Sequence, residues 1–313
     1  MAAATRLDHP VTAGGESFAA GRVRAFSQHA TPILAVLAVV IVAWYVAALF
    51  LNAHQVIELE FRGRTDWTWT EFVRHAMSMT RPVLPAPHQV AVEFFDSVFL
   101  RSPTSPRSLV YHAVVTSAAT ILGFALGAVL GVVLAVLIVH SRTLDRGMLP
   151  WIIASQTVPV LALAPIVIVL LGNLGITGLI PKAIISMYLC FFPVTIAMVQ
   201  GLRSPGTFEK ELLHTYAASK AQTFWKLRLP AALPMLLPSL RVAIAAGLVG
   251  TIVAELPTGA QAGLGARLLN GSYYGNVAQI WAALLMAALL GLLLTGAVAS
   301  IEWLALRRSR RLP

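Results

Sequence analysis

Residues 209–241 read EKELLHTYAASKAQTFWKLRLPAALPMLLPSLR, a polar, helix-prone segment in a chain that is otherwise largely apolar. The segment carries Lys210, Lys220, Lys226 and Arg228 against Glu209 and Glu211, and it ends in the prolines Pro230, Pro234 and Pro238. Apolar runs that could cross a bilayer lie on both sides of it. Because a loop that only connects two spans needs no ordered helical pattern, we interpret this segment as a docking surface for a cytoplasmic partner.

The composition is that of a polytopic membrane protein. Of the 313 residues, 58% are hydrophobic and 12% are charged, whereas about a quarter of the residues in soluble domains are charged. The formal net charge of +10 does not indicate a nucleic-acid partner, because the basic residues lie mostly in short loops and at the ends of apolar runs, where they fix topology. The single cysteine, Cys190, lies in an apolar run and cannot form an internal disulfide.

Six apolar runs predict an all-α integral membrane protein with six transmembrane helices in the lipid bilayer. We expect the spans at residues 32–51, 114–139, 151–171, 183–200, 240–253 and 277–299. Residues 1–30 are polar and lack the apolar core of a cleavable signal peptide, so we expect a cytoplasmic N-terminal tail followed by a transmembrane domain over 31–313. Residues 52–112 form a long connection in which 88–100 predicts an amphipathic surface helix. Residues 257–275 are expected to form a glycine-rich turn.

Gly123, Gly127 and Gly131 recur at every fourth residue of the second expected span. This spacing places them on one helix face, where a missing side chain lets a second helix approach closely. We interpret them as a helix-packing face, with a lining role in a substrate path as the less favoured alternative.

The distribution of basic residues predicts which side of the membrane each loop faces. Six spans place both chain ends on one side, and the rule that short cytoplasmic loops are rich in Lys and Arg selects the cytoplasm. The inside loops would then carry Arg142 and Arg146, the basic residues of the segment 201–239 and the arginines of the C-terminal tail, whereas the short outside loops would carry only Lys182 and Arg267. The connection 52–112 would face out, because a loop of about 60 residues weighs little in this rule.

Several kinds of chemistry have no signature in the sequence. No nucleotide-binding G-x-x-x-x-G-K-[ST] loop, H-E-x-x-H motif or Cys/His cluster at metal-ligand spacing occurs, so we expect neither an enzyme nor a metal site. Ion-coupled carriers usually bury several ionisable residues in their spans, but here we find only Glu255 and Glu302. We therefore expect a partner to supply the energy. Glu255 could line a substrate path, cap its helix or anchor the outer loop.

The central segment resembles the cytoplasmic motif of ABC importer permeases, E-A-A-x-x-x-G followed by nine residues and I-x-L-P. Glu211 stands at the first position and Ala217 at the glycine position, and the I-x-L-P positions are taken by Leu227, Leu229 and Pro230. The two alanines are replaced by leucines, and the glycine is lost. Because alanine adopts a positive φ less readily than glycine, this departure bears on the tightness of the turn.

The resemblance extends from about residue 84 to the C-terminus. The runs LPAPHQVAVEFF, GFALGAVLG and VPVLALAP are similar to the nitrate/sulfonate/taurine-type permeases, and ELPTGAQAGLGARLLNGSYYG is most similar to members for thiamine-pyrimidine precursors or riboflavin. The resemblance implies a type I importer fold with a cytoplasmic coupling helix, here about residues 211–229. It implies a permease subunit in a bacterial cell inner membrane that transports a thiamine-pyrimidine precursor or riboflavin-like heterocycle. Taurine, an aliphatic sulfonate or nitrate is the alternative cargo, and an ion-coupled secondary carrier is the less favoured alternative class.

The same resemblance implies the partners and the contact residues. Two ATPase subunits would dock below and bind the ATP, so the chain itself needs no cofactor. An extracytoplasmic solute-binding protein would deliver the substrate, and a second copy of the permease would complete a homodimer. We expect the ATPase contact at Glu211, Thr215, Ala217, Ala218, Ser219, Lys220, Leu227, Leu229 and Pro230.

Overall fold

The computed structural model describes residues 17–64, 66–256 and 261–309. These residues form helices and connecting turns without a β-strand, which confirms the all-α prediction. The chain divides into two compact units, Met1–Pro87 and His88–Pro313, and the boundary falls within the expected outside connection 52–112. The first 16 residues of the expected N-terminal tail lie outside the described residues, and residues 17–30 already belong to the first helix.

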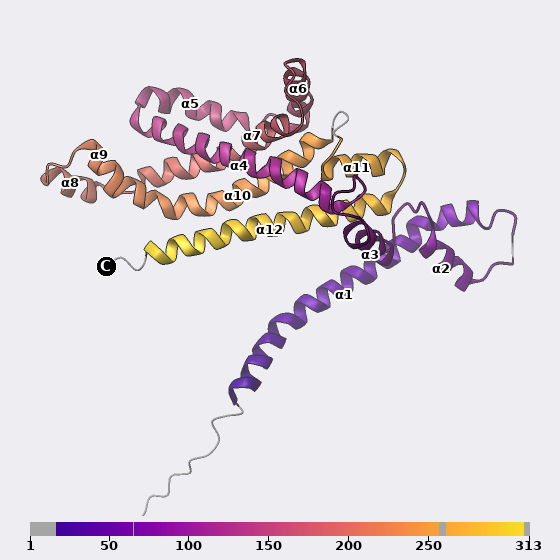
Figure 1. Cartoon of the computed structure of the whole chain (residues 1–313). Helices are drawn as coiled ribbons and strands as arrows, with labels where there is room; N and C mark the ends of the chain where they lie inside the picture. Colours follow the sequence, from indigo (N-terminus) through magenta and orange to yellow (C-terminus); the bar gives the residue numbers. More distant parts are fainter. Residues whose placement is uncertain (1–16, 65, 257–260, 310–313) are drawn as a thin grey trace, which may run out of the picture. The chain divides into compact units, whose positions relative to one another are not determined.

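The first unit consists of α1 (Ser17–Leu59) and the short α2 (Trp69–Ser78), shown in indigo and violet in Figure 1. The helix that contains the first expected span continues past residue 51 to Leu59. Asn52 is buried and fastens the segments that follow, because its side-chain amide donates to the carbonyls of Ala76 and Leu84 and accepts from the Leu84 N–H. The long connection therefore folds back on the end of its own helix.

The second unit is built around three long helices, α4 (Leu109–His140), α7 (Leu179–Arg203) and α10 (Leu229–Glu255), which run side by side in Figure 1. The glycines at positions 123, 127 and 131 face α7. A Cβ built on Gly123 would lie 2.4 Å from the Ser186 Cβ, and one on Gly127 would lie 2.5 Å from the Cys190 Cβ. Real Cβ atoms do not come this close, so the absence of side chains on α4 is what allows α7 to pack there.

The expected third span, 151–171, contains Pro159 and Pro165, and in the structure it is broken sharply at the first of these prolines. This part of the chain forms α5 (Arg142–Ser155) and α6 (Val160–Asn173), which meet at an angle of 100° across a short break. Pro159 lacks an amide hydrogen and disfavours helical geometry in the residue before it, so one helix ends and the next begins at this point. The described chain holds five helices long and apolar enough to cross a membrane, or six if the bent pair counts as one span.

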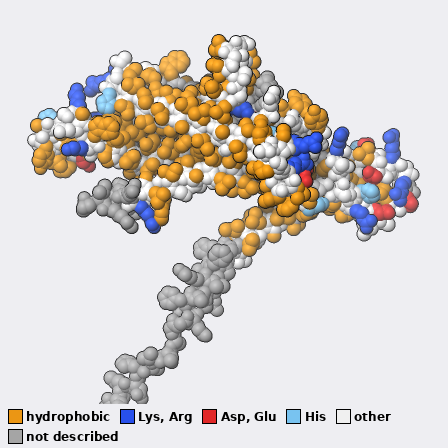
Figure 2. Space-filling model, viewed as in Figure 1, with side chains coloured by type: hydrophobic (Ala, Val, Ile, Leu, Met, Phe, Trp, Pro, Cys, Tyr) orange, Lys and Arg blue, Asp and Glu red, His pale blue; other side chains and the backbone are white. Residues whose placement is uncertain are grey.

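The remaining elements complete the unit around the three central helices. The segment 88–100 is helical, in α3 (Pro87–Phe95) and the π-helical turn η1 (Asp96–Leu100). The expected glycine-rich turn is wrong in its second half, because Leu264–Tyr273 forms the helix α11, while residues 257–260 lie outside the described residues. The last helix, α12 (Val277–Ser309), shares a hydrophobic core with α4, α10 and α11. In Figure 2, hydrophobic side chains dominate the visible flank of this unit, as expected for a surface in contact with lipid.

Candidate functional site

The segment predicted to dock a cytoplasmic partner forms two helices rather than one. The first is α8 (Thr207–Thr215), and the second begins with α9 (Lys220–Thr223), continues through the π-helical turn η2 (Phe224–Arg228) and runs on into α10. The expectation of one coupling helix over 211–229 is therefore wrong. The break at 216–219 follows from the turn that ends α8.

The turn after α8 is a Schellman motif with alanine in the glycine position. The Ala218 N–H donates to the Leu213 carbonyl over 3.0 Å, and the Ala217 N–H donates to the His214 carbonyl over 2.9 Å. Between these bonds Ala217 adopts φ 52°, and it is the only non-glycine residue with a positive φ in the described part of the chain. Since left-handed backbone costs an alanine about 1–2 kcal/mol, the motif's turn is retained here at some expense of stability.

Two other helices of the same unit end in the same way, but with glycine. Gly175 (φ 75°) follows α6, and Gly275 (φ 67°) follows α11. At these turns the amides of Ile176 and Asn276 donate back across the turn, to the carbonyls of Leu171 and Gly271. The hydrogen bonds match those around Ala217. The turn therefore keeps the same geometry although alanine stands in place of the motif glycine.

Ser219 starts the second helix with a capping box. Its hydroxyl accepts from the Gln222 N–H over 3.2 Å, and its own N–H donates to the Gln222 Oε1 over 2.8 Å. These bonds satisfy amide groups that a helix start otherwise leaves unpaired. The turn between the two helices is thus fixed on one side by the Ala217 conformation and on the other by the Ser219 cap.

The surface of this segment is exposed and mixes apolar with charged side chains. None of the residues of α8 is buried, and Tyr216, at the turn, is 77% exposed. Large apolar side chains at 208, 212 and 225 are also exposed. An open, mainly apolar pocket of about 490 Å³ lies beside α9, with Lys220 and Trp225 in its lining. Figure 1 shows α8 and α9 at one end of the unit, beyond the three central helices.

The structure distributes the predicted contact residues unevenly. Those in the first helix and the turn are exposed except Ala218, which is half-buried. In the second group Leu227 and Leu229 are half-buried, and only Pro230 is exposed. The turn residues 215–220 therefore form one accessible surface. The residues in the I-x-L-P positions belong to the start of the long helix.

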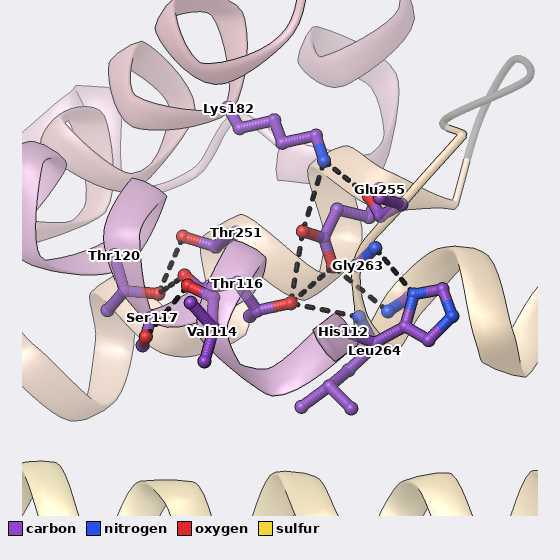
Figure 3. Close-up of polar contacts among 12 residues, drawn as sticks. His112, Val114, Thr116, Ser117, Thr120, Lys182, Thr251, Glu255, Gly263 and Leu264 are labelled. Carbon is purple, nitrogen blue, oxygen red and sulfur yellow. Dashed lines mark hydrogen bonds and ion pairs between the residues drawn. The ribbon is translucent and has the colours of Figure 1, made fainter. Parts of the chain in front are cut away.

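Glu255 lies at the far end of α10, in a buried polar network (Figure 3). Its side chain is fully buried, and Oε1 lies 3.2 Å from the Lys182 Nζ. The Thr116 hydroxyl donates to the same carboxylate over 2.9 Å, and the Gly265 N–H donates to it over 3.0 Å. Lys182, expected in an exposed outside loop, instead lies in the first turn of α7 with its side chain 11% exposed.

The network continues into the segment that begins α11. The Gly263 N–H donates to the His112 Nδ1 over 3.0 Å, and the Leu264 N–H donates to the Thr116 Oγ1 over 2.9 Å. The His112 Nε2 lies 2.9 Å from the Pro106 carbonyl and must donate to it. These two contacts assign a neutral imidazole with its hydrogen on Nε2. Lys182 also donates to the Ala262 carbonyl over 2.6 Å.

Sequence reasoning found Glu255 but missed its partners. The sequence places Lys182 in a loop, and His112 and Thr116 belong to no motif. The available signal is a threonine pair at 116 and 120 in an apolar helix; in the structure Thr116 donates to Glu255, and Thr120 donates to Thr251. Of the roles considered for Glu255, the anchoring of the outer segment matches its hydrogen bond to Gly265. Among the described residues, no group of three His, Cys, Asp or Glu side chains could hold a metal ion.

Comparison with known proteins gives a consistent family. Residues 127–310 match the family described as binding-protein-dependent transport system inner membrane component. The chain is 32% identical to the formylaminopyrimidine transport permease protein ThiX of Halalkalibacterium halodurans, over 70% of this chain and 83% of that protein. It is also 32% identical to the riboflavin transport system permease protein RibX of Chloroflexus aurantiacus, over 72% and 80% of the two chains. The putative aliphatic sulfonates transport permease protein SsuC of Bacillus subtilis is 27% identical, over 70% and 76%.

Proposed function

Because the chain belongs to the family of binding-protein-dependent transport system inner membrane components, we propose that it carries a thiamine-pyrimidine precursor or a riboflavin-like heterocycle across the membrane. Membership makes it a multi-pass inner-membrane permease subunit of an ABC importer. The ATPase activity of such an importer lies in separate subunits, and a substrate-binding protein delivers the solute.

The choice of substrate class rests on the relatives. The formylaminopyrimidine and riboflavin permeases share 32% identity with this chain over at least 80% of their own length, against 27% for the sulfonate permease. Both of the more similar relatives are named for nitrogen heterocycles. Import of an aliphatic sulfonate, taurine or nitrate by the same machinery is the second candidate.

The exposed turn at 215–220 is the proposed ATPase contact. It lies at one end of the unit, it is held in a defined shape by the Schellman motif and the Ser219 cap, and both Tyr216 and Lys220 are exposed on it. In this proposal Glu211 and the turn residues touch the ATPase, while Leu227, Leu229 and Pro230 start the helix that carries the motion inward. Two ATPase subunits, a permease homodimer, cytoplasmic termini and an outside-facing connection 52–112 complete the proposed assembly.

The long helix after the turn can transmit motion from the ATPase contact across the membrane. Residues Lys220–Glu255 form one helical run of 36 residues, which corresponds to about 54 Å at 1.5 Å per residue. A displacement of the ATPase at Ser219 is thereby transmitted through the membrane to Glu255. Because helices packed over glycines resist sliding, α4, α7 and α10 would rock as a body when the importer alternates between its inward- and outward-open states.

Uptake in cells tests the substrate. The chain is expressed with its neighbouring ATPase and binding protein, and labelled formylaminopyrimidine, riboflavin, taurine and nitrate are offered separately. We expect uptake of one ring compound, abolished when the phosphate-binding lysine of the ATPase is replaced. Uptake of taurine or nitrate alone would move the chain to the second candidate. Uptake that ignores the ATPase replacement would contradict the energy source.

Two variants of the turn test the docking surface. Ala217→Asp adds a charge in a residue type that tolerates left-handed backbone, so it probes the contact more than the turn, and deletion of Ser219 removes the cap. We expect both to abolish uptake while the permease is inserted at normal levels. Ala217→Gly is the matched control, because it keeps the backbone and adds no charge, and it should transport normally. Normal uptake by both test variants would refute the docking assignment.

A further inference from the structure

We propose that His112, Thr116, Lys182 and Glu255 form a latch that holds the first turn of α11 against the central helices, so that α11 and α12 follow α10 during transport. We name this set the α11 latch. The four side chains are positioning residues. The inference deepens the proposed function and rests on it, because it concerns how motion that enters at the coupling turn reaches the outer end of the unit.

The start of α11 cannot satisfy its own amide groups. A helix begins with N–H groups that have no partner within the helix, and a side chain at the N-cap usually accepts from one of them. The N-cap of α11 is Gly263, which has no side chain. The amides of residues 263, 264 and 265 donate instead to His112, Thr116 and Glu255, which belong to α4 and α10. The first turn of α11 is therefore completed by two other helices.

Both glycines of this segment are required by the contact with Glu255. A Cβ on Gly263 would lie 2.1 Å from the Glu255 Cδ, and Gly263 has φ 129°. A Cβ on Gly265 would lie 2.3 Å from the Ile252 carbonyl oxygen and 2.6 Å from the Glu255 Cβ. The carboxylate thus lies directly at the N-terminus of α11, where amides without partners in their own helix and the helix dipole favour a negative charge.

Lys182 joins the third central helix to the same point. Its ammonium group lies 3.2 Å from the carboxylate and 2.6 Å from the Ala262 carbonyl, so one side chain of α7 holds both α10 and the segment before α11. Figure 3 shows Lys182 reaching the carboxylate from the opposite side to Thr116. Because both charges are buried, loss of either one would leave the other unpaired.

The latch also reaches α12. Leu264, whose amide is held by Thr116, is fully buried in a core with Ala282, Ala283 and Ala287 of α12. The burial of Glu255 and Thr116 argues against a contact with passing substrate in this conformation, since neither has any exposed surface. Every hydrogen bond described here joins two groups of the protein, as a holding role requires, and none of them would be needed for a contact with substrate.

Neutralising the buried Lys182–Glu255 ion pair distinguishes a role in holding α11 from a role in contacting substrate. We compare uptake by Lys182→Met, Glu255→Gln and the double variant, each normalised to the amount of permease in the membrane. The latch predicts that Lys182→Met lowers uptake at least about tenfold, because it leaves a buried unpaired charge, and that the double variant recovers most of it. The side-chain amide introduced by Glu255→Gln can still accept from the Gly265 N–H in the double variant. A double variant as inactive as the worse single one would overturn the latch.

Labelling of the outer segment gives a readout that does not depend on substrate. With Cys190→Ala as the background, Gln261→Cys places a thiol at an exposed position next to the latch. We expect a membrane-impermeant maleimide to react several-fold faster in Lys182→Met than in the parent, and at nearly the parental rate in the double variant. Equal rates in all three would contradict the latch.

A milder variant covers the case in which Lys182→Met fails to insert. Thr116→Val keeps the shape of the side chain but removes the hydroxyl that bonds both Glu255 and the Leu264 amide. It should raise the labelling rate at position 261, and an unchanged rate would overturn the latch. The ATPase replacement described above is run in parallel. Uptake that survives it would refute the proposed function, whereas the labelling result would still decide the latch.

Discussion

The two ends of the long helix from Lys220 to Glu255 are held in opposite ways. At the Glu255 end a fully buried carboxylate is bound by side chains or amides from α4, α7 and α11. At the Lys220 end the chain is exposed, and the hydrogen bonds that define the turn, those of the Schellman motif and the Ser219 cap, join residues no more than five apart in sequence. One end is tied to its neighbours, and the other keeps its shape by itself.

This contrast suits a part that transmits motion. A surface that must bind and follow a partner has to keep its shape without contacts that the partner would displace, and local caps provide this. The opposite end has to move its neighbours, and a buried network with few alternative arrangements provides that. The following predictions test whether the two ends differ in this way.

The largest effect is expected from the same substitution at both ends, Lys182→Met and Lys220→Met. Breaking a buried ion pair costs about 3–5 kcal/mol because an uncompensated charge remains, whereas an exposed lysine on the surface contributes within about 0.5 kcal/mol. Thermal unfolding of the purified permease in detergent should therefore separate the two variants clearly. Uptake per permease molecule should fall in both, through the loss of the latch in the first and a weakened ATPase contact in the second.

The comparison would break if Lys220→Met destabilised the protein as much as Lys182→Met. The coupling end would then be part of the folded core rather than a free surface. A parental melting temperature for Lys182→Met would instead mean that the buried pair contributes nothing to stability.

Two glycine-to-alanine substitutions compare a crowded position at the latch with an open position in α12. Gly265→Ala would bring a Cβ within 2.3 Å of the Ile252 carbonyl oxygen, so we expect a loss of about 1–3 kcal/mol from overpacking. Gly296→Ala is the matched control, because it lies in α12 with nothing within 4 Å of the added atom. It should be neutral or gain up to about 1 kcal/mol from helix propensity. Unfolding curves that coincide for the two variants would contradict the packing argument.

The contrast between the ends also decides what the sequence could predict. The coupling segment was found because its chemistry is local: the spacing from Glu211 to Pro230 and the polar composition are visible in a row of letters. The sequence did not predict the break into two helices, because alanine rarely adopts a positive φ and therefore does not indicate the end of a helix. The capping serine at 219 was included among the contact residues, but its role as the start of a helix was not recognised.

The latch could not be predicted because its contacts are long-range. Thr116 and Glu255 are separated by 139 positions, and Lys182 and Glu255 by 73. Hydropathy placed Lys182 at the edge of a span, and an edge lysine is usually exposed, so the prediction of an outside loop followed. The all-α class and the approximate spans were predicted correctly because apolar length alone determines them. Pro159 marks the place of the break in the third span, but the 100° angle between α5 and α6 cannot be read from the sequence.

A smaller effect is expected from the cap of the second coupling helix. Ser219→Ala removes the hydroxyl that accepts from Gln222, and loss of such a cap typically costs about 1 kcal/mol. Hydrogen–deuterium exchange should therefore quicken in peptides covering α9. Thr68→Ala is the control, since Thr68 and Glu71 form the same box at the start of α2 in the first unit. It should quicken exchange in α2 and leave α9 and uptake unchanged. Slowed or unchanged exchange in α9 of Ser219→Ala would show that the turn is held by something else.

The smallest effect is a gain in stability at the coupling turn. Ala217→Gly should stabilise the end of α8 by about 0.5–1 kcal/mol, because the relief of left-handed strain exceeds the added freedom of the unfolded chain. Gly275→Ala, at the matching turn after α11, should lose a similar amount, because nothing lies within 4 Å of the added atom and only φ is at issue. Hydrogen–deuterium exchange of the amides at 217–218 and 275–276 would measure the change in stability at each of the two turns. If both variants shifted in the same direction, the backbone angle would not be what distinguishes the two turns. If they shifted in opposite directions with uptake unchanged in Ala217→Gly, the coupling turn would need its shape and not its strain.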